Sequence, residues 1–457
     1  MKVELIREPG WKMVSRIKGG EVAVEEYISS IFDWIEKKDT AINAYIKLMK
    51  KQALQRARSI DKKIKKGVSV GRLCGLGVAI KDNICIKGVE ATCSSAALLS
   101  YVPPLTATAV QRIERDDGII LGKTNMDEFA LDGCSYFGPT HNPWDSTRYP
   151  GGSSGGSAAA VSAFMATLSL GSDTAGSIRN PASFCSLHGL KPTYGLVSRR
   201  GLIPLAETFD QIGPLTRDAR DCALLLSSIA GPDPKDATTI RKGSEDYLKY
   251  LVEDVKDVKI AVPKGFFEGV QKPVERTVWR AIQKLEELGA TYEEISMKLL
   301  RYARLTFNAI SSVESFPNLS PYANRKIGDD VKKQIIAGYI FTHKERRFYE
   351  QATRVRTLLR EEFADVFKSF DALIGPTMAT LPFDLDEWKQ GAIYPKDGNR
   401  APANLTGMPA MSIPCGFYQG LPVGLQLMAP HLGEGLLFRI AYSYQQSTTH
   451  LEQMPPI

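Results

Sequence analysis

Short apolar runs that end in polar turns dominate the chain after about residue 66. Three of them are LCGLGVAIKDN (73–83), GIILGKTN (118–125) and ATLSLGSD (166–173). Each has the length and the glycine boundaries of a buried strand. Helix-like stretches at 107–116 and 155–165 alternate with these runs. This alternation predicts an α/β fold with a β-sheet covered by helices on both faces.

The spacing of apolar residues and the local composition change along the chain and predict four parts. Residues 22–37 have helical apolar spacing, and residues 53–66 are rich in Ala, Arg and Lys. Farther on, strand candidates stand at 258–262 and 372–374, a hairpin signal at 411–415 and 423–428, and a terminal helix at 435–446. The expected parts are an N-terminal helical cap (1–66), a core (67–232), a helical or mixed insertion (233–395) and a C-terminal part that completes the core (396–457).

Composition is that of an ordinary soluble globular protein. Of the 457 residues 43% are hydrophobic and 24% are charged, and this length exceeds what one hydrophobic core usually supports. The first residues carry charges and no apolar block, and the run 158–170 is too short to span a bilayer, so we expect a cytoplasmic protein. Seven cysteines without a CxxC pair suggest neither a disulfide framework nor a zinc site. The lysine-rich run 62–66 is more typical of a solvated helix face than of a nucleic-acid patch.

The segment PGGSSGGSAAAVSAFMA (150–166) puts glycines and serines directly before an apolar, alanine-rich helix. Its composition alone would also suit a flexible linker. Glycines ahead of a helix let backbone N–H groups converge on negative charge. A phosphate loop would need Lys-Ser or Lys-Thr after the last glycine, but Ser157 and Ala158 follow Gly156, which disfavours nucleotide binding.

The segment GSDTAGSIRNPAS (171–183) repeats this device at the end of an apolar strand. Ser177 follows the strand on a turn, where a nucleophile is exposed on one side. The backbone amides of Thr174, Ala175, Gly176 and Ser177 can converge there on a developing oxyanion. Taken alone, the segment would equally suit a Ser/Thr-rich turn that satisfies its own backbone.

Lys81 stands at the end of the apolar run Gly77–Ile80. A lysine in this position commonly extends its ammonium to solvent. When it is desolvated instead, its pKa falls and the neutral amine can act as a base. Such a base could take a proton from Ser177 by way of Ser153.

Together these segments resemble the amidase signature family, in the family's order along the chain: 75–83, 122–130, 151–160, 171–182 and 210–217. The resemblance implies the amidase-signature fold with a mixed central sheet. It also implies a Ser-Ser-Lys triad at Lys81, Ser153 and Ser177, with an unusual cis peptide next to Ser153. The implied reaction is amide hydrolysis through an acyl-enzyme, without a metal or organic cofactor.

Within the family the resemblance is greatest to the glutaminase (A) subunits of tRNA-dependent amidotransferases. It covers most of the chain and rests on GKTNMDEFA (122–130), YFGPTHNPW (136–144), LKPTYGLVSR (190–199) and NLTGMPAMSIPCG (404–416). It implies release of ammonia from glutamine for B and C partner subunits, with tRNA, ATP and Mg²⁺ engaged only through a partner. Asp397 stands where the aspartate of those subunits holds the glutamine amino group.

Some positions depart from the pattern of those subunits. Gln334, in VKKQ, replaces the arginine expected to bind the glutamine carboxylate, and Phe307 replaces an aromatic residue that carries a hydroxyl. Ala175 replaces a glycine of the turn, and the segment between Asp132 and Tyr136 is shorter than usual. A free-standing amidase that acts on other small carboxamides is therefore an alternative.

Two further classes of function have other signatures. Residues 152–156 fit the G-x-S-x-G pattern of α/β-hydrolase esterases with Ser154 as nucleophile, but that scheme needs a histidine base from among His188, His343, His431 and His450. A non-catalytic RNA-binding scaffold would have no activity for Ser177→Ala to remove. An esterase triad would survive Lys81→Ala, whereas a Ser-Ser-Lys triad would not.

Overall fold

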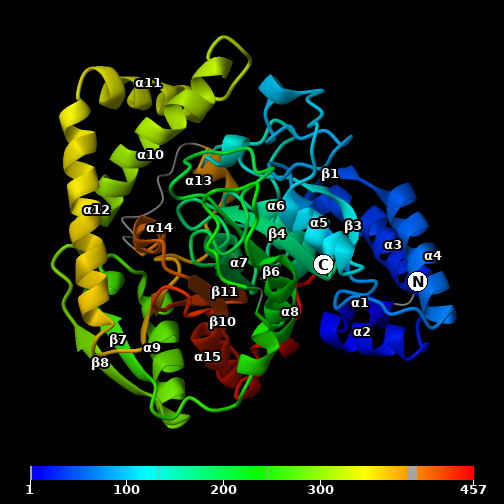
Figure 1. Ribbon diagram of the computed structural model, residues 1–457. Coiled ribbons are helices and arrows are strands. Elements are labelled where there is room, and N and C mark those ends of the chain that lie inside the picture. Colours follow the sequence, from blue (N-terminus) through cyan, green and yellow to red (C-terminus); the bar gives the residue numbers. More distant parts are fainter. Residues whose placement is uncertain (1–2, 132, 244, 390–398) are drawn as a thin grey trace.

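The computed structural model describes residues 3–131, 133–243, 245–389 and 399–457. In this part of the chain one continuous β-sheet has the strand order β1 (Tyr45–Leu48), β3 (Ile119–Thr124), β2 (Gly77–Lys81), β4 (Leu168–Asp173), β6 (Gln211–Thr216), β5 (His188–Lys191), β10 (Ala410–Tyr418), β11 (Leu421–Met428), β9 (Ala372–Pro376), β7 (Lys259–Pro263) and β8 (Thr291–Ile295). Helices lie on both faces of this sheet (Figure 1). Strand β2 runs parallel to β3 and β4, whereas β4 and β6 are antiparallel. The predicted α/β fold with a mixed central sheet is confirmed.

The strands predicted from the apolar runs form the centre of one half of the sheet. Every residue of β2, β3 and β4 is buried. Such strands consist mainly of apolar and small residues because both of their faces are covered. They are connected or followed by the helices α5 (Thr108–Arg115), α6 (Gly155–Ser162), α7 (Arg179–Phe184) and α8 (Ala219–Ile229). Helix α6 ends three residues earlier than the predicted 155–165.

The sequence had suggested that the N-terminal part is purely helical, but the structure shows that it also contains a strand. It contains helices α1 (Val3–Arg7), α2 (Gly10–Lys18), α3 (Val24–Ile42) and α4 (Lys50–Lys65), and also strand β1. Strand β1 pairs antiparallel with β3 at one edge of the sheet. Only Tyr45 of β1 is buried, so this short edge strand carries little apolar signal.

Residues 245–389 supply three strands to the other end of the same sheet. Strands β7 and β9 are parallel neighbours and match the predictions at 258–262 and 372–374. Strand β8 was not predicted because its TYEEI sequence is polar and mostly accessible to solvent. The helices here are α9 (Lys272–Glu287), α10 (Ala303–Leu319), α11 (Asp329–His343), α12 (Arg346–Val366) and α13 (Leu385–Lys389). Helices α10, α11 and α12 pack together and project from the body of the molecule (Figure 1).

The C-terminal residues return to the centre of the sheet. Helix α14 (Ala401–Thr406) leads into the β10–β11 hairpin, and α15 (Glu434–Gln446) follows, as predicted. Strand β10 also pairs with β5, which connects the C-terminal hairpin to the β4–β6 region. Short 3-10 helices lie at Ala96–Leu98, Glu128–Ala130, Tyr247–Tyr250, Lys264–Phe267, Leu300–Tyr302, Ser320–Tyr322 and His450–Glu452. A single sheet runs through all four predicted parts of the chain, and the boundaries between these parts stay a prediction.

None of the helices in the described ranges combines the length and the apolar character needed to cross a membrane.

Candidate active site

Lys81 is the last residue of β2, and its side chain is completely buried. Its Nζ lies 2.6 Å from Ser153 Oγ, and it also donates to Ser172 Oγ at 3.0 Å and to the Ser172 carbonyl at 3.3 Å. The ammonium therefore does not reach bulk water, which excludes the solvent-exposed alternative. The structure brings together the lysine and the first serine of the predicted triad.

Burial lowers the pKa of Lys81 from 10.5 to about 7 because the cation loses its hydration. The carboxylates of Asp127, Asp173 and Asp210 act in the opposite direction and favour the ammonium. A pKa near 7 means that a large fraction of the amine is neutral at ordinary cellular pH. The neutral amine has one lone pair, and Ser153 Oγ lies within hydrogen-bond distance of it. Lys81 can therefore act as the base for Ser153.

Ser153 lies in the glycine-rich loop just before α6, and the peptide bond Gly152–Ser153 is cis, as the family resemblance implied. The loop is packed against neighbouring backbone rather than free as a linker would be. At Gly156 an added Cβ would lie 2.4 Å from the Asn125 carbonyl and 2.6 Å from the Ala44 carbonyl. Only glycine permits this approach.

Ser177 follows β4 on the turn that carries Asp173 to Gly176, and its exposed fraction is 6%. Its loop touches the Ser153 loop, because the Ser154 N–H donates to the Ser177 carbonyl at 3.2 Å. Among the described residues no hydrogen bond joins the Ser153 and Ser177 hydroxyls. The structure thus places the loop of Ser177, the predicted nucleophile, beside the Ser153 loop.

The predicted set of oxyanion amides needs one correction. The N–H of Gly176 donates to Asp173 Oδ1 at 2.7 Å, so the neighbouring carboxylate already occupies it. In the described part of the chain the amides of Thr174, Ala175 and Ser177 donate no hydrogen bond. Ala175 is the most exposed residue of the turn. These three amides remain able to stabilise an oxyanion.

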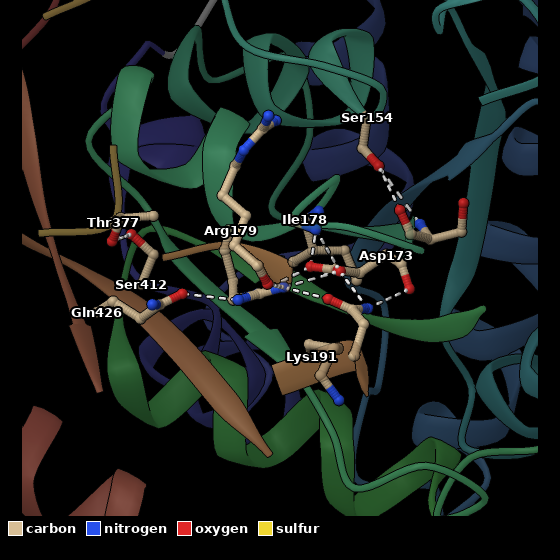
Figure 2. A network of polar contacts seen from close by, with 12 residues as sticks. Ser154, Asp173, Ile178, Arg179, Lys191, Thr377, Ser412 and Gln426 are labelled. Carbon is tan, nitrogen blue, oxygen red and sulfur yellow. Dashed lines mark hydrogen bonds and ion pairs between the residues drawn. The ribbon is translucent and has the colours of Figure 1, made fainter. Parts of the chain in front are cut away.

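A buried ion pair holds this turn in place (Figure 2). Arg179 and Asp173 are both completely buried, and Arg179 Nε lies 3.0 Å from Asp173 Oδ2. Arg179 also donates to Gln426 Oε1 of β11 at 2.7 Å and to Asn404 Oδ1 of α14 at 2.7 Å. Burial alone would raise the pKa of Asp173, but the charge of Arg179 and the hydrogen bonds that Arg179 and the Asn404 amide donate to the carboxylate hold it well below its ordinary value. Asp173 is therefore ionised and fixes the turn through two amides, those of Gly176 and Ile178.

Asp210, from the DQIGPLTR segment, supports the same turn from the other side. Its Oδ1 accepts a hydrogen bond of 2.6 Å from the Thr174 hydroxyl, and its Oδ2 accepts the amides of Leu205 and Ala206. Burial raises the pKa of Asp210 to about 6, although these hydrogen bonds favour the carboxylate. The first residue of the oxyanion turn is thereby tied to the loop before β6.

The residues assigned to substrate contacts are less well defined. Asp397 lies outside the described residues. Gln334, on α11, donates from Nε2 to Ser315 Oγ of α10 at 2.9 Å. Phe307 packs on Phe209 with ring centroids 5.0 Å apart. Gln334 thus connects two helices of the α10–α12 group, and Phe307 packs on the loop before β6; no hydrogen bond among the described residues joins either to Lys81, Ser153 or Ser177.

The esterase alternative lacks its base. Ser154 is completely buried, and its hydroxyl donates to the Ser172 carbonyl at 3.2 Å. In the described ranges no histidine contacts it. His188 lies near the Arg217 carbonyl, His431 near the Thr406 carbonyl and His450 near the Tyr444 hydroxyl, while His343 packs on aromatic rings. Within the same ranges no cluster of three potential metal ligands occurs.

Three residues that shape the site were not predicted from the sequence. Arg179 and Asp210 lie inside quoted segments, but their partners come from distant parts of the chain. Lys123 is completely buried within β3, beside the strand that ends at Lys81. A lysine in an apolar run was the signal used for Lys81, and the same signal was present at Lys123.

Comparisons with known proteins show the family to which the chain belongs. The family model described as Amidase matches residues 26–438, and the chain therefore belongs to the amidase family. The A subunit of the glutamyl-tRNA(Gln) amidotransferase of Clostridium botulinum (strain Loch Maree / Type A3) is 43% identical over 93% of this chain and 94% of its own length. The crystal structure of the protein of the same name from Thermotoga maritima is 36% identical, covers 94% of both chains and has a TM-score of 0.82.

A second solved structure is also similar over nearly the whole chain. It is described as an unexpected vestigial protein complex that reveals the evolutionary origins of an s-triazine catabolic enzyme. Its chain is 29% identical, and the match covers 96% of this chain and 98% of that one with a TM-score of 0.90. The present chain is thus related over most of its length to A subunits of amidotransferases and shares its fold with other members of the amidase family.

Proposed function

We propose that this chain is the glutaminase subunit of a tRNA-dependent amidotransferase. It would hydrolyse glutamine and supply the ammonia that converts misacylated Glu-tRNA(Gln) or Asp-tRNA(Asn) to Gln-tRNA(Gln) or Asn-tRNA(Asn). The observation that carries this proposal is the 43% identity, over 93% of the chain, to the A subunit of a glutamyl-tRNA(Gln) amidotransferase. The buried Lys81, 2.6 Å from Ser153, supports the amidase chemistry that this function needs.

The proposed cycle uses only side chains and amides of this chain. Neutral Lys81 takes the Ser153 proton while Ser153 takes the Ser177 proton, and Ser177 Oγ bonds to the carboxamide carbon. The amides of Thr174, Ala175 and Ser177 stabilise the resulting oxyanion. The proton returns along the relay to the leaving nitrogen, so ammonia departs and an acyl-Ser177 ester remains. Water attacks the ester by the same relay, which releases the acid and restores the serine.

The partners, cofactors and location form part of the same proposal. The ammonia that this chain would release has to be used by another subunit, so we expect B and C partner subunits. A partner subunit would bind tRNA, and ATP and Mg²⁺ would enter the reaction only through a partner subunit. The amidase step in this chain would need no cofactor. We also expect the chain to act in the cytoplasm, where it would meet the tRNA-binding partner.

A second candidate is a free-standing amidase for other small carboxamides. Two observations favour it. Gln334 stands where a carboxylate-binding arginine is expected and is bonded to Ser315. The chain is also closer in fold to the structure whose description concerns an s-triazine catabolic enzyme, at a TM-score of 0.90, than to the amidotransferase structure, at 0.82.

The deciding experiment measures ammonia release by the purified chain. It is incubated with glutamine and with a panel of small amides, alone and together with the B and C subunits encoded by the same organism. A glutaminase subunit forms a stable complex and hydrolyses glutamine far faster within it. A free-standing amidase hydrolyses another amide alone and is not stimulated. Ser177→Ala must abolish the release in either case, and activity that survives this change refutes both candidates.

A further inference from the structure

A second buried lysine, Lys123, binds the turn that follows Lys81. This turn is closed by a hydrogen bond of 2.9 Å from the Ile84 N–H to the Lys81 carbonyl. Lys123 Nζ donates to the Asp82 carbonyl at 3.0 Å and to the Ile84 carbonyl at 2.7 Å. Buried carbonyl groups of a turn need donors, and here one ammonium supplies two hydrogen bonds. Lys123 thereby fixes the backbone from which the Lys81 side chain extends.

Lys123 also balances the charge of the residue next to Lys81. Its Nζ lies 3.3 Å from Asp82 Oδ1, and both side chains have an exposed fraction of 0%. The other oxygen, Asp82 Oδ2, accepts hydrogen bonds from the Thr92 amide and hydroxyl. Asp82 Oδ1 accepts no hydrogen bond within the described residues, so its compensation comes from the nearby Lys123 charge.

This balance matters because Lys81 already faces several acidic groups. Those that favour its protonated form are Asp127 of the loop after β3 (125–127), Asp173 at the end of β4, Asp210 before β6, and the Cys93 thiol. Asp82 is adjacent in the chain, and in the dry interior an uncompensated carboxylate there would favour the ammonium further. Of the cations in the described part of the chain, Lys123 is the one in contact with Asp82.

We propose that Lys123 is a positioning residue of the amidase reaction, which clamps the turn after Lys81 and neutralises Asp82 so that Lys81 can be a neutral base. The proposal rests on the proposed role of Lys81 as the base for Ser153 and Ser177. Within the described residues Lys123 Nζ makes no hydrogen bond to either serine, and its polar partners there all belong to the 81–84 turn. Its two effects are separable, because one is geometric and the other electrostatic.

The test measures how fast a fluorophosphonate probe modifies Ser177 of the full-length chain as a function of pH. Lys123→Met removes the cation and the clamp, and Asp82→Asn removes the anion. We expect the midpoint of the rate profile to rise by about one pH unit in Lys123→Met and to fall by about as much in Asp82→Asn. The double variant restores the charge balance, so its midpoint returns to that of the wild type. Its maximal rate stays reduced several-fold, because the clamp is still missing.

Lys47→Met is the matched control. Lys47 is the register partner of Lys123 on β1, but its side chain is 46% exposed and paired with Glu90, so solvent screens its charge. Its profile should match the wild type. Superimposable profiles for folded Lys123→Met and Asp82→Asn overturn the proposal. If Lys123→Met does not fold, the double variant and Asp82→Asn decide. A wild-type maximal rate in the double variant would refute the clamping role of Lys123. An unshifted midpoint in Asp82→Asn would refute its charge-balancing role. Labelling that survives Ser177→Ala would instead refute the proposed nucleophile.

Discussion

Replacing Lys81 with methionine should stabilise the protein at low pH and should also abolish acylation of Ser177. Lys81 is completely buried, and its pKa falls from 10.5 to about 7 through lost hydration. At about 1.4 kcal/mol per pKa unit, holding the ammonium in the folded chain costs about 5 kcal/mol. Methionine has a similar shape and no charge, so Lys81→Met removes this cost. It also removes three hydrogen bonds, worth about 1 kcal/mol each.

The pH dependence gives this prediction its sign. The unfolded chain keeps the Lys81 proton up to about pH 10.5, whereas the folded chain releases it near 7, so this group makes the wild type more stable as pH rises between those values. At pH 6 the variant should be more stable by about 2 kcal/mol, the difference between the two contributions above. At pH 9 the remaining charge cost is about 2 kcal/mol, so the variant should be less stable by about 1 kcal/mol.

The measurement is chemical denaturation of both proteins at pH 6 and pH 9 at equal ionic strength. The reasoning requires the sign of the stability difference to reverse between the two pH values. A variant that is less stable at pH 6, or a difference that does not change with pH, would show that Lys81 is hydrated in the folded chain. Fluorophosphonate labelling of Ser177 in the same samples should be lost in the variant at both pH values.

Three further predictions concern the same site. With a Lys81 pKa of about 7, the neutral fraction rises from about one tenth at pH 6 to about nine tenths at pH 8, so the Ser177 labelling rate should rise about tenfold, and a flat profile would contradict Lys81 as the base. Arg179→Met leaves the Asp173 carboxylate buried without its cation and should cost about 3–5 kcal/mol of stability in urea denaturation; a loss below about 1 kcal/mol would mean that the ion pair does not hold the turn. Gly156→Ala puts a Cβ 2.4 Å from the Asn125 carbonyl and should cost about 1–3 kcal/mol by thermal or urea denaturation. Gly243→Ala, where an added Cβ meets nothing within 4 Å, should change little, and an equally harmless Gly156→Ala would restore the linker interpretation.

The strands that carry the site could be predicted because their signals are local. Strands β2, β3 and β4 are largely apolar runs: β2 ends with Lys81, β3 ends at the 125–127 loop, and β4 ends at the Ser177 turn. Strand β6 was missed, since Gly213 and Pro214 lie inside it and proline lacks the N–H that a central strand needs. The sheet tolerates Pro214 because β5 pairs only with Leu215 and Thr216 on that side. This tolerance depends on a neighbour and is invisible in the segment itself.

The candidate site divides in the same way. Glycine spacing and short serine-containing turns identified the loops of Ser153 and Ser177, because these features act within a few residues. The capture of the Gly176 amide by Asp173 was not predicted, although both residues belong to one turn, because the carboxylate's position depends on Arg179 and Asn404. The amide predicted for the oxyanion is therefore used to hold the turn.

The sequence by itself determined the buried strands β2, β3 and β4, the loops that carry the candidate nucleophiles, and the family to which the chain belongs. Only the tertiary structure decided that Lys81 is dry, since a pKa near 7 requires other elements to exclude water from every side of the ammonium. Strand β5 pairs with both β6 and β10, and the β5–β10 pairing joins residues about two hundred positions apart, so no local pattern could predict it. Local patterns select elements, whereas desolvation and strand pairing depend on the assembled fold.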